Sequence, residues 1–114
     1  MNQLNQIILE GNLVRDAELV QTSVCEVLKA TVAVDRFYKN KDGETVKEVS
    51  YFHIEAYGIL AERIGSKCKK GRAIRVIGRL KQNRWKDSDG KEHSIVLVIA
   101  EHIDFKPDST KEVE

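Results

Sequence analysis

The chain has 114 residues, enough for one domain with a hydrophobic core and too few for two domains of ordinary size. Hydrophobic residues make up 41% and charged residues 32% of the sequence, a composition that excludes the disordered and fibrous classes. No apolar run approaches the roughly 20 residues of a membrane helix, and the start of the chain lacks a secretion signal. We therefore expect a cytoplasmic protein with no membrane partner.

The formal net charge of +1 hides an uneven distribution of charge along the chain. Residues 63–91 contain eleven Lys and Arg against two Asp, whereas residues 101–114 contain five acidic and two basic residues. A segment as basic as the first is typical of an anion-binding surface. A solvated sheet edge protected by lysines has the same composition.

Alternating patterns rich in β-branched residues dominate the chain and predict strands. The expected strands lie at residues 5–14, 25–39, 47–58, 72–85 and 93–105. Gly11 interrupts the first pattern and indicates a bulge or a close backbone approach. Residues 15–23 are interpreted as a polar link, and the pairs Asp42-Gly43 and Asp89-Gly90 predict tight hairpin turns.

Residues 59–71 change period, because Leu60, Ile64 and Cys68 recur every four positions. This spacing predicts a short amphipathic helix that ends at Gly71. The order is then three strands, one helix and two strands, which predicts a mainly β fold: a five-stranded OB barrel with the helix between strands 3 and 4. We assign residues 1–106 to this domain and residues 107–114 to a short, disordered tail.

Strand alternation also predicts which side chains face the core. In the third strand the inward set is Ser50, Phe52, Ile54 and Ala56. In the fourth strand the inward set is Ile74, Val76, Gly78 and Leu80. A bulge at Gly78 would shift the register of the fourth strand.

Catalytic and metal-binding motifs are not evident. His53, His93 and His102 are scattered, and no HExxH, GxSxG or phosphate-binding loop occurs. We therefore expect no enzyme activity, no catalytic residue, no metal site and no cofactor. Cys25 and Cys68 fall in different elements and are expected to be reduced, buried thiols.

Binding of single-stranded nucleic acid requires cations that contact phosphates and aromatic rings on which unpaired bases stack. Each ring considered alone has a plain alternative role in covering the barrel, but several rings together with one basic stripe favour a binding face. The predicted nucleic-acid-binding residues are Phe37, Tyr51, Tyr57, Arg75, Arg79, Lys81, Arg84, Trp85 and Lys86.

Four segments in the same order and spacing carry a resemblance to a known family. They are IILEGNLVRDAEL at 7–19, YFHIEAYGILAE at 51–62, KKGRAIRVIGRLKQNRW at 69–85 and DSDGKEH at 87–93. Together they resemble the bacterial single-stranded DNA-binding protein family, from about residue 4 to residue 105. The resemblance implies an OB-fold homotetramer that coats single-stranded DNA of the nucleoid without sequence preference during replication, recombination and repair.

The resemblance also implies roles for particular residues. Trp85, Tyr57 and Tyr51 match stacking positions of the family, and Phe37 matches a fourth, with Tyr38 as the alternative if the loop is shifted by one. In the family the first strand pairs with that of a neighbouring subunit, which would explain the apolar run at residues 7–9. An acidic tail tip recruits replication and repair proteins in the family; the final residues KEVE do not match it, so such partners stay open.

Two other functions remain open on the residues. One is a primosome-type or RNA-binding OB protein of the same lineage. The other is an adaptor whose basic face binds an acidic protein.

Overall fold

A computed structural model describes residues 2–107 of the chain, and the tail expected at residues 107–114 lies, apart from Pro107, outside the described residues. The elements are β1 (Ile7–Leu13), β2 (Glu18–Gln21), β3 (Glu26–Lys39), β4 (Thr45–Tyr57), α1 (Ile59–Ile64), a 3₁₀ turn (Gly65–Lys67), β5 (Ala73–Lys86) and β6 (Glu92–Phe105). Five strands pair in the order β1-β5-β6-β4-β3, and pairing of β1 with β3 closes the barrel. This mainly β, closed five-stranded barrel with one short helix is consistent with the predicted OB fold.

The expected position of the helix was wrong, because α1 lies between β4 and β5 and not between strands 3 and 4. The difference is β2, which falls within the predicted polar link and pairs with the start of β3 from Glu18↔Lys29 to Gln21↔Glu26. The turn between these strands has no glycine. Instead, the hydroxyl of Thr22 accepts a hydrogen bond from the amide of Cys25 at 3.1 Å and donates one to its carbonyl at 2.8 Å.

The core is formed by the inward residues of the barrel and by the segment that follows β4. Leu28, Val32, Ile54 and Val76 are almost completely buried. The helix and the turn after it add Ala61, Ile64 and Cys68 to the same cluster. A helix is present where it was predicted, but it ends at Ile64 and not at Gly71, so Cys68 reaches the core from beyond the 3₁₀ turn.

A bulge sits where the sequence suggested one, but on the neighbouring strand. Ile77 pairs with His102 whereas Gly78 pairs with Ala100, so Glu101 of β6 has no partner in β5. The alternation of β5 itself is unbroken. A side chain at Gly78 would collide with the carbonyl oxygen of Ile99, which explains why a glycine lies where β5 approaches the bulge of β6.

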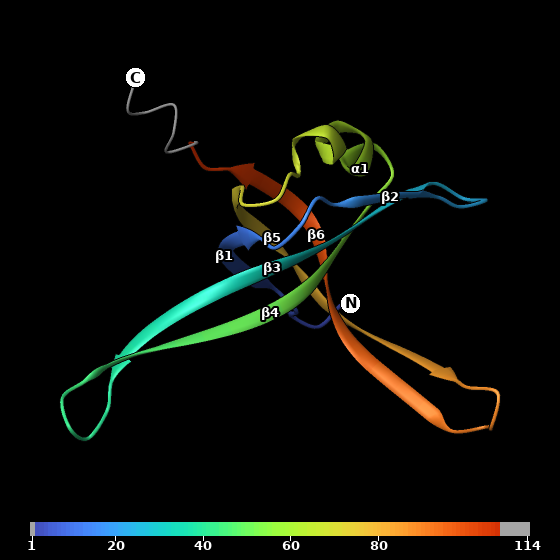
Figure 1. The fold of residues 1–114 in the computed structure, drawn as a ribbon. Coiled ribbons are helices and arrows are strands. Elements are labelled where there is room, and N and C mark those ends of the chain that lie inside the picture. The colour runs from blue at the N-terminus through green and yellow to red at the C-terminus, as the bar shows by residue number, and fades with distance from the viewer. Residues whose placement is uncertain (1, 108–114) are drawn as a thin grey trace.

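Two long hairpins extend beyond the barrel as separate arms, well away from α1 (Figure 1). We call residues 35–49 the β3–β4 arm and residues 81–96 the β5–β6 arm. Phe52 and Leu80, both expected in the core, are 37% and 44% exposed. Both lie near the base of an arm, where the opposite wall of the barrel no longer covers the inward side of the strand.

Candidate nucleic-acid interface

Three of the predicted aromatic residues lie on one face of the β3–β4 pair. Directly opposed residues of an antiparallel pair share a face, and alternate residues along a strand share it too. Val27 opposes Tyr57, Ala33 opposes Tyr51 and Phe37 opposes Lys47, so this odd-numbered set lies on the outer side of the barrel wall. The side chains of Phe37 and Tyr51 are 63% and 64% exposed, and that of Tyr57 is 37% exposed.

The same face continues across β6 to β5. Glu55 of β4 is in register with Ile99 of β6, and Ile99 opposes Arg79. Following alternate residues along β5 from Arg79 leads to Lys81 and then to Trp85, which is half exposed. We call this side of the sheet the aromatic face. Its four rings are Phe37, Tyr51, Tyr57 and Trp85.

The register also separates Phe37 from its alternative, Tyr38. Tyr38 opposes Val46 and therefore points to the other side of the arm. The guanidinium of Arg36 lies 5.2 Å from the centre of the Tyr38 ring, in cation–π geometry. Phe37 is thus the ring that belongs to the aromatic face.

The five predicted basic residues are placed unequally. Arg79 and Lys81 share the aromatic face, whereas Arg84 and Lys86 alternate to the other side of β5. Arg84 and Lys86 nevertheless border a cleft of about 480 Å³ together with Trp85. Within residues 2–107 none of these four forms an ion pair, and the guanidinium of Arg84 donates a hydrogen bond only to Gln82, at 3.0 Å.

Arg75 lies elsewhere, beyond the bulge and opposite β1. Its guanidinium nitrogens lie 2.6 and 2.7 Å from one carboxylate oxygen of Glu10. The ammonium of Lys106 lies 3.1 Å from the other oxygen. Arg75 therefore forms an ion pair with an acidic side chain, which the other four basic candidates do not do among the described residues.

Tyr57 and Glu55 form a polar pair on the aromatic face. The phenol donates a hydrogen bond to the Glu55 carboxylate at 2.5 Å. Partial burial, followed by this hydrogen bond and the charge of Glu55, raises the pKa of Tyr57 to about 12. The ring is therefore uncharged at neutral pH and repels no phosphate.

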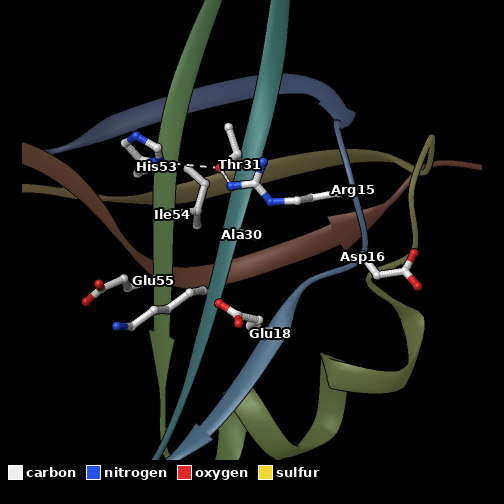
Figure 2. A pocket seen from close by; sticks show the side chains of 9 residues that line it. Arg15, Asp16, Glu18, Ala30, Thr31, His53, Ile54 and Glu55 are labelled. Atoms are coloured by element: carbon white, nitrogen blue, oxygen red, sulfur yellow. Dashed lines mark hydrogen bonds between the residues drawn. The ribbon is translucent and has the colours of Figure 1, made fainter.

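A cleft of about 400 Å³ beside His53, Ile54 and Glu55 of β4 adds residues that were not among the predicted binding residues (Figure 2). Its wall carries Lys29, Thr31 and His53 from the aromatic face, and Arg15 reaches over it from the segment after β1. The Thr31 hydroxyl lies 3.3 Å from both the Arg15 guanidinium and Nδ1 of His53. The cleft joins three separate segments, so only the pairing of the strands could reveal it.

Other kinds of site are less well supported in the described part of the chain. Residues 2–107 contain no group of three or more His, Cys, Asp or Glu placed to hold a metal ion. None of the helices in that range has the length and apolar character needed to cross a membrane. Cys68 is buried as expected, whereas Cys25 is half-buried, and both are free thiols.

A barrel of this topology with aromatic rings and unpaired cations on one face is an arrangement typical of OB domains that bind single strands. Residues 4–106 match the model of the single-strand binding protein family. The chain belongs to that family. It is 37% identical over 101 residues to a single-stranded DNA-binding protein of Aquifex aeolicus, covering 88% of this chain and 68% of the relative.

Other relatives and solved structures agree with this assignment. A single-stranded DNA-binding protein of Treponema pallidum is 36% identical, and the match covers 90% of this chain and 58% of the relative. A deletion mutant of the Thermus aquaticus protein of the same name superimposes with a TM-score of 0.82 at 30% identity, over 91% of this chain and 51% of that one. A Plasmodium falciparum SSB complex with ssDNA has the same fold, with a TM-score of 0.83 at 19% identity over 94% and 98% of the two chains.

Proposed function

We propose that the chain binds single-stranded DNA without sequence preference and protects it in replication, recombination and repair in the cytoplasm. Bases stack on Phe37, Tyr51, Tyr57 and Trp85, while nearby lysines and arginines contact phosphates. Stacking is indifferent to sequence because every base has a π face. Duplex DNA binds weakly, since its bases are already stacked against one another.

The single observation that supports this proposal best is the strand register from β3 through β4 and β6 to β5. It brings rings from three strands onto one outer surface, with Arg79 and Lys81 on the same side. The four rings are 37% to 64% exposed and can therefore contact a ligand.

Titration with fluorescently labelled oligo(dT), followed by anisotropy, tests the proposal directly. We expect tight binding of the single strand and weak binding of a duplex of equal length. The affinity should fall with salt, with a log–log slope of about −0.7 per phosphate contact. Trp85→Ala should weaken binding by about 1–3 kcal/mol. Equal affinity for duplex and single strand would contradict the proposal.

Two alternative functions predict different results in the same assay. An RNA-binding protein of this lineage would prefer oligo(U) to oligo(dT) of equal length. An adaptor that uses the basic face to bind an acidic protein would tolerate alanine at Trp85 and Tyr57, but would lose its ligand on charge reversal of Arg79 and Lys81.

We further propose a homotetramer, in which one strand contacts several aromatic faces and gains avidity. In support, residues 7–11 of β1 pair only with β5, so their other edge is unpaired within the described residues. Ile8 on this strand is 61% exposed. Light scattering during size exclusion measures the mass in solution, and a monomer at micromolar concentration would contradict the tetramer.

A further inference from the structure

The outer end of the β5–β6 arm holds Trp85 against His93, its partner across the hairpin. The two residues are opposed in register. Their ring centres lie 5.6 Å apart and their planes are inclined by 21°, which is a stacked arrangement. The imidazole therefore lies against one face of the only tryptophan in the chain, and the tryptophan is still 50% exposed.

The imidazole is itself held in place by the turn. Nε2 of His93 lies 2.7 Å from Oδ2 of Asp87. The other carboxylate oxygen of Asp87 accepts hydrogen bonds from the amides of Asp89 and Lys91 at 2.9 and 3.0 Å. The carboxylate thus connects the backbone of the tight turn to the imidazole, and the imidazole contacts the indole.

We propose that His93 is a positioning residue for base stacking: it covers one face of Trp85, holds the indole against the arm and directs a single base onto the opposite face. The inference rests on the proposed function, and it assigns a role to a histidine that the sequence analysis treated as one of three scattered residues. The result is a three-layer stack of imidazole, indole and base.

The carboxylate of Asp87 can accept the hydrogen bonds that hold the turn and the imidazole together. The hydrogen bond with His93 is the main cause that lowers the pKa of Asp87, so the carboxylate stays ionised in mildly acidic solution. The other charged groups around the cleft are Arg84 and Lys86 of β5 and Glu92 of β6, with Lys91 in the turn.

Two matched variants isolate the role of the ring. His93→Gln keeps a hydrogen-bonding group for Asp87 but removes the aromatic ring, and His93→Phe keeps an aromatic ring but removes the hydrogen bond to Asp87. His102→Gln is the control, because His102 also lies 2.7 Å from a carboxylate, that of Asp104, but is not opposed to an aromatic residue.

Emission from Trp85 without DNA gives the first measurement. Loss of the stacked ring should expose more of the indole to water. We expect the emission maximum of His93→Gln to lie at longer wavelength than that of the wild-type chain, with His93→Phe and His102→Gln close to the wild type. An unchanged emission maximum in His93→Gln would overturn the inference.

Anisotropy of labelled oligo(dT) gives the second measurement. We expect His93→Gln to weaken binding by about 2- to 10-fold, with His93→Phe close to the wild type. His102→Gln should bind like the wild type. Unchanged binding by His93→Gln, beside normal binding by the wild type, would overturn the inference alone. Failure of the wild type to bind would overturn the proposed function and this inference with it.

Discussion

The phenol of Tyr57 donates a hydrogen bond to Glu55, two positions earlier on β4, and this places a carboxylate on the face proposed to bind a polyanion. We expect Glu55→Gln to lower the pKa of Tyr57 from about 12 only part of the way, because burial is the larger cause of the shift. Absorbance of tyrosinate between about pH 9 and 13 measures this change. Tyr51→Phe provides the control, since it removes a different phenol from the titration.

The same substitution should also act on stability and on binding. The raised pKa means that the neutral phenol favours the folded state, so this contribution is present below pH 10.0 and is lost as the pH rises toward 12.

Glu55→Gln also removes a negative charge beside the phosphates. We expect it to tighten binding of oligo(dT) by roughly 1 kcal/mol or less; weaker binding would argue that no phosphate lies near Glu55.

Phe37 and Tyr38 are adjacent rings on opposite sides of the β3–β4 arm. We expect Phe37→Ala to weaken binding of oligo(dT) by about 1–3 kcal/mol, because a stacking surface is lost. Tyr38→Ala should leave the affinity nearly unchanged. Anisotropy titrations of the two variants side by side provide the comparison, and the reverse pattern would show that the strand follows the other side of the arm.

Arg15 and Lys29 border the cleft beside His53 and Glu55 of β4. If a phosphate lies in this cleft, Arg15→Ala and Lys29→Ala should each reduce the steepness of the salt dependence by about 0.7. Arg63→Ala, on α1 and away from the arms, is the control and should leave the slope unchanged (Figure 1). A slope that stays at the wild-type value in both cleft variants would exclude phosphate from this cleft.

Glu10 stabilises the fold in a pH-dependent way. Hydrogen bonds from Arg75 and Lys106 lower its pKa below the ordinary value of 4.5. The ionised carboxylate therefore favours the folded state, and this contribution is present above pH 4.5 and is lost as the pH falls through the lowered pKa. We expect urea unfolding to show wild type more stable than Glu10→Gln at pH 7, with the difference shrinking in acid. A constant difference would contradict the linkage.

The sequence could predict the features that depend on local patterns. Alternation located the five barrel strands to within two residues at most ends, and the Asp-Gly pairs located both arm turns. β2 was missed for two reasons. The turn after it is closed by the Thr22 hydroxyl and contains no glycine. The strand itself, ELVQ, has no long run of apolar residues. Phe52 and Leu80 were placed in the core because alternation records the side of a strand and not where the barrel wall ends.

The candidate site was predictable as a list of residues but not as an arrangement. Aromatic and basic residues stand out in the sequence, and the strand register places the four rings on one face. The partners of those residues depend on register between distant segments, so Glu10 beside Arg75, Arg15 over Thr31 and His93 against Trp85 could be found only from the fold.

The β3–β4 and β5–β6 hairpins pair directly with each other over only a short stretch. β4 and β6 meet in parallel through two register pairs, Ile54↔Val98 and Glu55↔Ile99, and the two arms diverge from this seam (Figure 1). A DNA strand that runs from Trp85 to Phe37 would cross this short seam and hold the two hairpins together. Bound oligonucleotide would then oppose separation of the hairpins, and the melting temperature of the protein would rise with the concentration of oligonucleotide.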